Sequence, residues 1–321
     1  MDAKILITTK LPEGPKQHFL NLSDEVKIRD SDGVTPKEEL LQQVVGCVGL
    51  VCSYKDVIDV DVLNAAGPKL KVICTISVGY DHIDVEECKK RNILIGNTPG
   101  VLSDAVAELT IALLLATTRR LNEALDAVKS GVWGPFNMMW LCGTQLNGRT
   151  VGIVGLGKIG LAVVERLIPF GVGRIIYSGH SEKSEAAKFN GTFVDFTSLL
   201  QQSDIVIICC ALTPQTKGLF DQAAFSQMKK NAIMINISRG PVVNQDDLYA
   251  ALTTGQIQAA GLDVTTPEPI PTDHPLMGLK NCVIFPHIGS ATTDTRTEMI
   301  MRTFYNLEAG LTGERLPFSV Y

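Results

Sequence analysis

The sequence predicts an α/β fold with two doubly wound parallel sheets. Short apolar runs alternate with amphipathic helical segments along the whole chain, which is the pattern of repeated β-α-β units. A length of 321 residues is about twice that of an average domain, so two domains are expected. With 45% hydrophobic and 20% charged residues, the composition is that of a globular protein with a sizeable core.

The first third of the chain contains four predicted strands. They are Lys4–Thr8, Val48–Cys52, Lys71–Ile76 and Ile93–Gly96. Helices are expected between them, including Pro36–Val45 and Asp59–Ala65. The sequence Asn-Thr-Pro-Gly at 97–100 breaks this series, and a long helix is expected from Ser103 to about Leu121.

A second series of strands begins after residue 149. They are Thr150–Val154, Arg174–Ser178, Ile205–Cys210, Ala232–Asn236, Ala259–Val264 and Cys282–Phe285. A helix follows from Asp294 to about Leu311. We expect the second domain, 102–290, to be inserted into the first, 1–101 and 291–321, with the helices near Ser103 and Asp294 as the two crossings. Ligands of such sheets bind at the carboxyl ends of the strands, so the chemistry is expected in the cleft between the domains.

Charge and cysteine content exclude several classes of protein. A net charge of −5 disfavours nucleic acid and anionic membrane surfaces as partners, and a small anionic substrate then needs a local positive site. None of the eight cysteines forms a CxxC pair or has metal-ligand spacing, so we expect reduced thiols and no metal. The N-terminus does not read as a signal or transit peptide, and the longest apolar run, Ile111–Ala116, is too short for a membrane span. The expected compartment is the cytoplasm.

A glycine-rich turn follows the first strand of the second series. The segment Gly155–Gly160 reads Gly-Leu-Gly-Lys-Ile-Gly, a GxGxxG pattern that runs from an apolar strand into a helix. Gly155 permits the tight turn, Gly157 lets the backbone approach a pyrophosphate, and Gly160 lets helix and strand pack closely. The helix N-terminus favours phosphate charge. This context predicts a Rossmann dinucleotide site.

The end of the next strand bears on which dinucleotide binds. NAD sites usually place Asp or Glu there to hold the ribose 2′-hydroxyl, but this chain has Ser178. Groups able to donate to a 2′-phosphate follow, namely His180, Ser181 and Lys183. The sequence therefore favours NADP(H). Glu182 in the same loop and the absence of an arginine keep NAD(H) open as the weaker alternative.

Three polar segments follow later strands of the second domain. They are Asn236–Gly240, Leu262–Pro269 and Phe285–Thr292. Each puts a titratable or charged group at a strand end. Taken singly, Arg239 also suits a surface ion pair, Glu268 a solvated loop acid and His287 a structural histidine. Together, Arg, Glu and His in that order after three strands of a nucleotide-binding sheet indicate a 2-keto acid reductase.

Several separate motifs carry a resemblance over essentially the whole chain. They are Ser77–Asp84, Gly155–Gly160, Asn236–Gly240, Gly261–Pro269 and Pro286–Thr292. With them the chain resembles the D-isomer-specific 2-hydroxyacid dehydrogenase family, and within it most closely the glyoxylate/hydroxypyruvate reductases. The resemblance implies a flavodoxin-like substrate-binding domain, a Rossmann domain, and reduction of glyoxylate to glycolate and of hydroxypyruvate to D-glycerate.

The resemblance also implies residue roles. His287 is the general acid that protonates the carbonyl oxygen, as suits a group that exchanges protons near neutral pH, and Glu268 fixes its tautomer. Arg239 binds the substrate carboxylate together with the backbone amides of Val78 and Gly79. Ser290 lines the cleft, and Asp263 orients the nicotinamide. The remaining residues assigned to the cofactor are Lys158, Ile159, Ala211, Ile237 and Gly289.

The segment Gly131–Gly148 is apolar but has no steady period. We expect it to belong to a dimerisation arm of about 123–148 and the protein to be a homodimer, as the resemblance implies. Phe136 or Trp140 would reach the partner's pocket, or the aromatic residues would only pack at the interface. No catalytic role is expected for His18, His82 or His274.

Three other readings stay open. One is an NAD-linked dehydrogenase for another keto acid. The second is a relative with the same fold: formate dehydrogenase would have Gln where this chain has Glu268, and phosphoglycerate dehydrogenase often carries an added domain. The third is a cofactor-sensing binding module like the C-terminal-binding-protein corepressors, which usually have extended tails.

Overall fold

The computed structural model describes residues 3–321, and the chain forms two compact units. Unit 1 comprises the chain up to Leu102 and again from Thr292 onward, whereas unit 2 comprises Ser103–Ala291. The sequence of unit 2 is thus inserted into that of unit 1. Both boundaries fall one residue beyond the expected ones.

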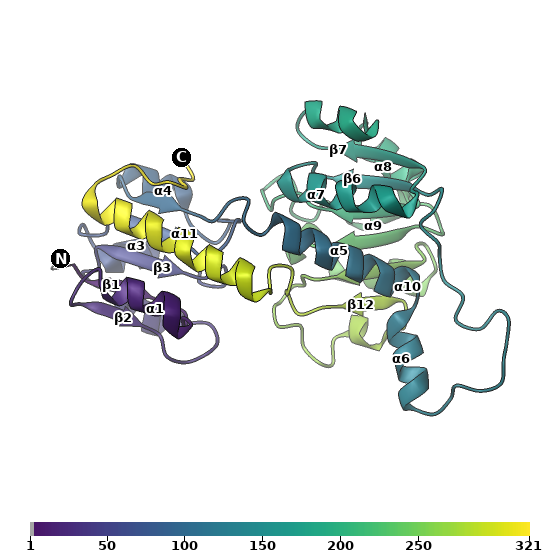
Figure 1. Ribbon diagram of the computed structural model, residues 1–321, viewed down its shortest axis with the longest axis horizontal. Coiled ribbons are helices and arrows are strands. Elements are labelled where there is room, and N and C mark those ends of the chain that lie inside the picture. Colours follow the sequence, from purple (N-terminus) through teal and green to yellow (C-terminus); the bar gives the residue numbers. More distant parts are fainter. Residues whose placement is uncertain (1–2) are drawn as a thin grey trace. The chain divides into compact units, whose positions relative to one another are not determined.

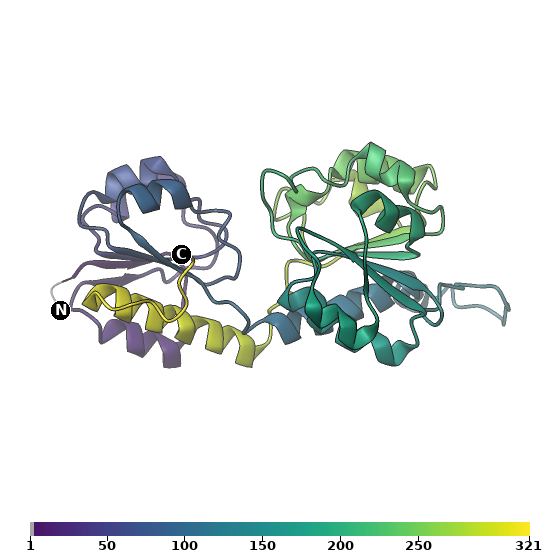
Figure 2. The ribbon, with the colours of Figure 1, turned by 90° about the horizontal axis from the view of Figure 1, so that it is seen from above.

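Unit 1 is built on a five-stranded parallel sheet with the strand order β2-β1-β3-β4-β5. The strands are β1 (Ile5–Ile7), β2 (Val26–Ile28), β3 (Gly49–Cys52), β4 (Val72–Thr75) and β5 (Leu94–Gly96). The helices are α1 (Glu13–Leu20), α2 (Lys37–Gln43), α3 (Val60–Ala66), α4 (Val85–Lys90) and α11 (Thr293–Thr312). This strand order is that of a flavodoxin-like sheet, and Figure 2 shows helices on both of its faces.

Each face of this sheet has its own core, because successive strand residues point to opposite sides. Ile7 packs on the face covered by α1 and α11, where it shares a buried cluster with Phe304. Leu6 packs on the other face, in a cluster with Leu63 of α3. Aspartates cap two of the helices on this face. Asp59 accepts the amides of Asp61 and Val62 at the start of α3, and Asp84 accepts that of Glu87 at the start of α4.

Unit 2 is built on a seven-stranded parallel sheet with the strand order β12-β11-β10-β9-β6-β7-β8. The strands are β6 (Thr150–Val154), β7 (Arg174–Ser178), β8 (Thr192–Phe193), β9 (Ile205–Ile208), β10 (Ile233–Asn236), β11 (Ala259–Leu262) and β12 (Cys282–Ile284). The order reverses between β6 and β9, which is the switch point where doubly wound sheets bind ligands at the carboxyl ends of the strands.

Helices cover both faces of the unit 2 sheet (Figures 1 and 2). One face is covered by α5 (Ser103–Thr118), which packs against α7 (Lys158–Leu167), β10 and β11. The other elements are α6 (Leu121–Lys129), α8 (Phe196–Gln202), α9 (Gln222–Gln227), α10 (Gln245–Thr253) and the 3-10 turns η1 (Ile168–Phe170), η2 (Ser184–Phe189), η3 (Gly240–Val242) and η4 (Pro275–Gly278). The helix α9 packs between α8 and α10.

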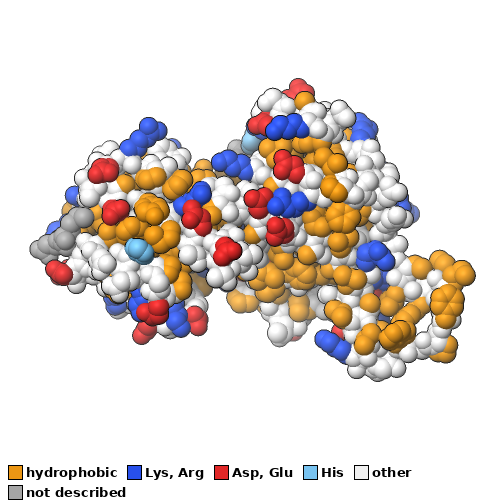
Figure 3. All heavy atoms as spheres, in the orientation of Figure 1, with side chains coloured by type: hydrophobic (Ala, Val, Ile, Leu, Met, Phe, Trp, Pro, Cys, Tyr) orange, Lys and Arg blue, Asp and Glu red, His pale blue; other side chains and the backbone are white. Residues whose placement is uncertain are grey.

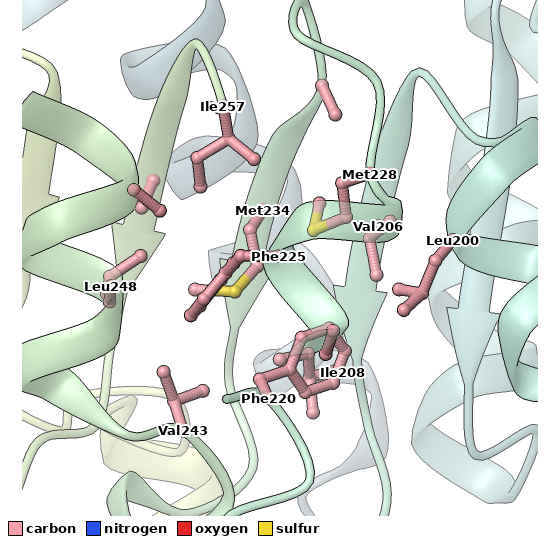
Figure 4. Close-up of a cluster of buried hydrophobic side chains, with 14 of the residues drawn as sticks. Leu200, Val206, Ile208, Phe220, Phe225, Met228, Met234, Val243, Leu248 and Ile257 are labelled. Carbon is pink, nitrogen blue, oxygen red and sulfur yellow. The ribbon is translucent and has the colours of Figure 1, made fainter. Parts of the chain in front are cut away.

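Figure 4 shows the core on the side of α9 and α10. Phe225 of α9 and Leu248 of α10 meet Met234 of β10 in one buried cluster. Phe220 lies beside Phe225 with ring centroids 6.4 Å apart. Full burial of one such side chain stabilises the fold by about 1.5–3 kcal/mol, so this cluster holds the strands whose ends carry the polar segments in place.

Three elements differ from expectation. The expected helix from Ser103 to about Leu121 is two helices, because Arg120 has a left-handed φ of 55° that ends α5 at Thr118 and starts α6 at Leu121. The edge strands β2 and β8 were not predicted. The two residues of β8 are both exposed, so they show none of the apolar signal of a central strand.

Among residues 3–321 no helix combines the length and apolar character that crossing a membrane requires.

Candidate active site

The polar segments of unit 2 follow strands that end in register. Asn236 of β10 pairs with Leu262 of β11, and Leu262 pairs in turn with Ile284 of β12. Parallel strands end at one edge of the sheet, so the loops after β10, β11 and β12 start side by side. These loops carry Arg239, Glu268 and His287.

An acid–histidine pair joins two of these loops. Glu268 Oε2 lies 2.8 Å from His287 Nδ1, and each side chain is 20% exposed. The other oxygen, Oε1, accepts the backbone amide of Thr265 at 3.2 Å. The carboxylate therefore accepts from both sides, which fixes the hydrogen on Nδ1 and the orientation of the imidazole.

Asp263 holds the backbone of the loop that carries the histidine. Its two carboxylate oxygens accept the amides of Ile288 at 2.9 Å and Gly289 at 2.8 Å. His287 itself has a left-handed φ of 55°, an unfavourable conformation that these two bonds help to maintain. Burial raises the pKa of Asp263, while the Ile288 amide and the charge of His287 act in the opposite direction. Asp263 thus orders the His287 turn, and its role in orienting the nicotinamide stays a prediction.

The turn after β10 is held by hydrogen bonds among its own residues. Asn236 Oδ1 accepts both the amide and the hydroxyl of Ser238, at 3.0 and 2.9 Å, and its Nδ2 donates to the carbonyl of Arg239 at 3.1 Å. The Arg239 guanidinium donates through Nη1 to the Ser238 carbonyl at 2.9 Å. A Cβ on Gly240 would lie 2.0 Å from the carbonyl oxygen of Thr265. Only glycine lets this turn pack directly on the loop that leads to Glu268.

The glycine-rich turn fits a dinucleotide. Gly155 has φ +93°, and a Cβ there would lie 2.7 Å from the Cys210 backbone. Gly157 caps the N-terminus of α7, and a Cβ there would meet nothing within 4 Å, so a phosphate has room to approach. A Cβ on Gly160 would lie 2.7 Å from the Gly155 carbonyl oxygen. No acidic residue stands in the first turn of α7, which suits an anion at its positive end.

The loop after β7 is exposed from Gly179 to Glu185, whereas Ser178 is buried. The Lys183 amide donates to the Tyr177 hydroxyl at 2.9 Å, which anchors the loop and leaves the lysine side chain in solvent. Next to Ser178 is a hollow of about 690 Å³. Its lining residues are Val154, Ser178, Gly179, Phe193, Val194, Asp195, Phe196, Ser198 and Leu219.

Asp195 in this hollow is a charged residue that the sequence reasoning missed. It caps α8, accepting the Ser198 hydroxyl at 2.6 Å and the Ser198 amide at 2.9 Å. These two bonds lower the pKa of Asp195, and the bond from the Ser198 hydroxyl has the larger effect. The signal was present in the sequence as an Asp three residues before a Ser at a helix start.

The other residues assigned to the cofactor follow four different strands of the same unit. Lys158 is exposed and Ile159 half-buried at the start of α7, Ala211 is exposed after β9, and Ile237 is buried after β10. Gly289 is buried, and a Cβ there would lie 3.1 Å from the Asp263 carboxylate. Ser290 is half-buried.

In unit 1, the loop after β4 presents backbone donors. The carbonyls of Ser77 and Val78 accept from the Thr98 amide at 2.9 Å and the Asn97 side chain at 2.8 Å. The Gly79 carbonyl accepts from the Ser77 hydroxyl at 2.6 Å. Within residues 3–321, the amides of Val78 and Gly79 donate to no protein group. Two free adjacent amides with their carbonyls tied elsewhere suit an anion.

An apolar arm leaves unit 2 after α6. Figure 3 shows hydrophobic side chains gathered over α6 and the segment 131–148; Phe136 is 90% exposed, and Trp133, Met138, Met139 and Trp140 are also exposed. The root of the arm is fixed where the Thr144 amide donates to the Thr118 carbonyl at 2.8 Å. An apolar surface of this kind marks an interaction site.

Comparison with known proteins agrees with this geometry. Residues 111–289 match the family described as "D-isomer specific 2-hydroxyacid dehydrogenase, NAD binding domain". The chain is 52% identical to the glyoxylate reductase/hydroxypyruvate reductase of Mus musculus over 98% of its own length and 96% of the mouse protein.

Similar solved structures hold different nicotinamide cofactors. One is the NADPH-dependent glyoxylate/hydroxypyruvate reductase from Sinorhizobium meliloti in complex with NADP and malonate, with a TM-score of 0.86, 29% identity, and coverage of 100% of this chain and 97% of that one. The other is D-lactate dehydrogenase from Aquifex aeolicus with NAD and lactic acid, with a TM-score of 0.87, 26% identity and 99% coverage of both chains. These two relatives differ in the cofactor that they hold.

Proposed function

Since this chain belongs to the D-isomer-specific 2-hydroxyacid dehydrogenase family, we propose that it reduces glyoxylate to glycolate and hydroxypyruvate to D-glycerate with NADPH. The family makes it an oxidoreductase with a Rossmann unit for a nicotinamide cofactor. The observation that carries the proposal is the 2.8 Å contact between Glu268 and His287, at the strand edge that also carries Arg239. This set provides a proton donor, a group that orients it, and a cation for a carboxylate.

The protein groups divide the work of reduction. When bound, the reduced nicotinamide supplies the hydride that the keto carbon accepts. Arg239 pairs with the substrate carboxylate and draws charge onto the carbonyl oxygen. The amides of Val78 and Gly79 supply further donors to the carboxylate. His287 gives its Nε2 proton to the oxygen on which negative charge develops.

Glu268 acts through the imidazole. Its Oε2 accepts the hydrogen on Nδ1 at 2.8 Å, which leaves Nε2 as the ring nitrogen that gives up a proton. Asp263 keeps the His287 turn in its left-handed conformation. After transfer, the product has gained one hydride on carbon and one proton on oxygen, and the neutral imidazole regains its proton from water.

NADPH is our choice over NADH because of the loop after β7. Ser178 leaves the strand end without the carboxylate that would repel a 2′-phosphate, and the exposed His180, Ser181 and Lys183 can donate to one. Glu182 and Asp195 act against the phosphate, although the Asp195 oxygens are already engaged by Ser198. NAD(H) is the weaker alternative.

We propose that the arm makes the protein a homodimer, with Phe136 or Trp140 of the arm reaching the partner's substrate pocket. The apolar residues at the arm's tip are exposed among residues 3–321. A second copy would bury the same apolar surface on both subunits, because a symmetric dimer interface uses one patch twice. Light scattering tests this: a mass of two chains is expected, and a single-chain mass contradicts it. We place the protein in the cytoplasm, since all eight cysteines are unpaired.

The test of function is the initial rate at which reduced nicotinamide absorbance is lost with glyoxylate or hydroxypyruvate. Faster saturable turnover with NADPH supports the whole proposal. Faster turnover with NADH keeps the reaction and overturns the cofactor choice. No turnover of any 2-keto acid, in protein that still binds the cofactor and a short peptide, contradicts the enzyme and favours a binding module.

A further inference from the structure

A network of three hydrogen bonds ends on the loop that presents the amides of Val78 and Gly79. His82 Nε2 lies 3.0 Å from Thr75 Oγ1, Thr75 Oγ1 lies 2.7 Å from Ser77 Oγ, and Ser77 Oγ donates to the Gly79 carbonyl at 2.6 Å. Thr75 and Ser77 are buried, and His82 is half-buried. This hydrogen-bond network thus connects His82, which takes no part in the proposed reaction, to the candidate anion site.

The direction of each bond follows from counting protons. The Gly79 carbonyl can only accept, so the single hydroxyl proton of Ser77 is directed to it. Ser77 Oγ must then accept the hydroxyl proton of Thr75. Thr75 in turn has no proton left for His82, so Nε2 of His82 must donate. The network therefore selects the tautomer with hydrogen on Nε2, and it is complete only with a donor at position 82.

The neighbouring thiol does not disturb this order. Cys52 Sγ lies 3.8 Å from the same His82 nitrogen, farther away than Thr75. Burial, with help from Asp56, raises the pKa of Cys52 well above its usual value, although a hydrogen bond with Thr75 acts in the opposite direction. The thiol is therefore neutral, adds no charge beside the histidine, and is a weaker hydrogen-bond partner for Thr75 than the Ser77 hydroxyl.

The bond at the end of the chain acts on the conformation of the loop. The carbonyls of Ser77 and Val78 are held by backbone and side chain groups of residues 97 and 98. Only the Gly79 carbonyl depends on the chain from His82. If Ser77 were not oriented by Thr75, its hydroxyl could turn away, and the peptide that carries this carbonyl could rotate with its neighbours. Free adjacent amides bind an anion only while they point to one place.

We propose that His82 is a positioning residue that acts through Thr75 and Ser77 to keep the amides of Val78 and Gly79 aimed at the substrate carboxylate. This inference rests on the proposed function for the carboxylate, but not on the choice of keto acid or cofactor. A residue in this place acts on substrate binding more than on the chemical step.

The test compares two variants that interrupt the hydrogen-bond network with one that restores it. His82→Leu removes the donor, and Thr75→Val replaces the hydroxyl by a methyl group of the same shape. Each is expected to raise KM for the keto acid about tenfold, the effect of one net hydrogen bond, while kcat changes less than about threefold and KM for the cofactor stays the same. His82→Gln, whose amide can donate, should restore most of the affinity.

The double variant shows whether the two residues act as one device. His82→Leu with Thr75→Val should raise KM no further than the larger single effect, because residues in one network are not additive. His18→Leu is the control: His18 lies on α1 and is exposed, so this variant should keep the KM of the parent. Equal KM values in all variants, additive effects of the two substitutions, or a fall in kcat alone would overturn the proposal.

A binding measurement separates this proposal from the proposed function. Oxalate, a two-carbon dicarboxylate, is titrated by calorimetry into the cofactor-bound protein and its variants, and melting temperatures confirm that each variant is folded. Oxalate affinity about tenfold lower in His82→Leu and Thr75→Val supports the positioning role even if no keto acid is turned over. Equal affinity in parent and variants, or no oxalate binding to the parent, overturns it even if turnover is seen.

Discussion

Glu268 Oε2 and His287 Nδ1 are 2.8 Å apart, and they come from loops after neighbouring strands of one parallel sheet. The chain between the two residues includes β12. The pair forms only because β11 and β12 are parallel neighbours that end in register. A carboxylate in this place accepts the hydrogen on Nδ1 and gives the imidazole one fixed orientation. The predictions below test what this pair and its neighbours do.

Replacement of His287 should remove the proton donor while the site stays formed. His287→Asn is preferable to alanine, because asparagine tolerates the left-handed φ of 55° at this position. We expect kcat to fall by about 10²–10⁴ with little change in the dissociation constant of the cofactor. Stopped-flow rates and nicotinamide fluorescence measure the two. His274→Asn, which keeps a side chain acceptor for the Leu276 amide at the start of η4, should turn over like the parent; unchanged turnover in His287→Asn would remove this histidine from the mechanism.

Replacement of Glu268 by glutamine should lower turnover while the site stays formed. In Glu268→Gln the side chain keeps its shape, but its amide can donate to His287 Nδ1 as well as accept from it, so the hydrogen on Nδ1 is no longer fixed. A ring that accepts at Nδ1 carries a single hydrogen and is a poor proton donor, so kcat with glyoxylate should fall by up to about 10⁴. Glu165→Gln removes one charge from the exposed side of α7 and should turn over like the parent. Unchanged kcat in Glu268→Gln would contradict the role of this carboxylate.

The loop after β7 should determine cofactor preference. Ser178→Asp places a carboxylate at the strand end, where it repels a 2′-phosphate and can accept from a ribose 2′-hydroxyl. The ratio of kcat/KM for NADPH to that for NADH should fall at least about tenfold. Lys183→Ala should lower the same ratio, and Lys188→Ala in η2 serves as its matched control. A constant ratio in both loop variants would mean that other residues select the cofactor.

Low pH should destabilise the start of α6, the helix that leads into the arm. Arg120 donates to both oxygens of Glu123, at 2.8 and 2.7 Å, and this bonding lowers the pKa of Glu123 below its usual 4.5. A lowered pKa in the folded state means that the unfolded chain binds the proton first, so this stabilisation is complete above pH 4.5 and is lost as pH falls through the lowered value. Melting temperatures of the parent and Glu123→Gln between pH 7 and about 3 should converge in acid; a constant gap would contradict the prediction.

The sequence was most informative where burial is complete. Strands such as β6 and β7 have the predicted bounds, because each contains four consecutive buried residues that are mostly apolar, which leaves few alternatives. It was least informative at the edges: Val26–Ile28 is a half-exposed strand with a lysine at its centre. The long helix was also wrong at Arg120, since a left-handed arginine has no sequence signature comparable to glycine or proline.

The candidate site shows the same division. The order Arg239, Glu268, His287 was readable because each follows a predicted strand. The hydrogen bonds of Asp263 could not be predicted from the sequence. Its carboxylate accepts two amides 25 and 26 residues away, and such contacts depend on the loop conformation alone. The chain from His82 to Gly79 was hidden for a similar reason: serine, threonine and histidine are common in ordinary turns, and only distances reveal the order of their protons.

The central claim is that this protein delivers a hydride to the keto carbon of a small 2-keto acid and yields the D product. The most direct measurement is chiral chromatography of the product formed from hydroxypyruvate and NADPH, together with the amount of NADPH consumed. We predict D-glycerate alone, in an amount equal to the NADPH oxidised. L-glycerate, a mixture of both forms, or NADPH loss without glycerate would contradict the account.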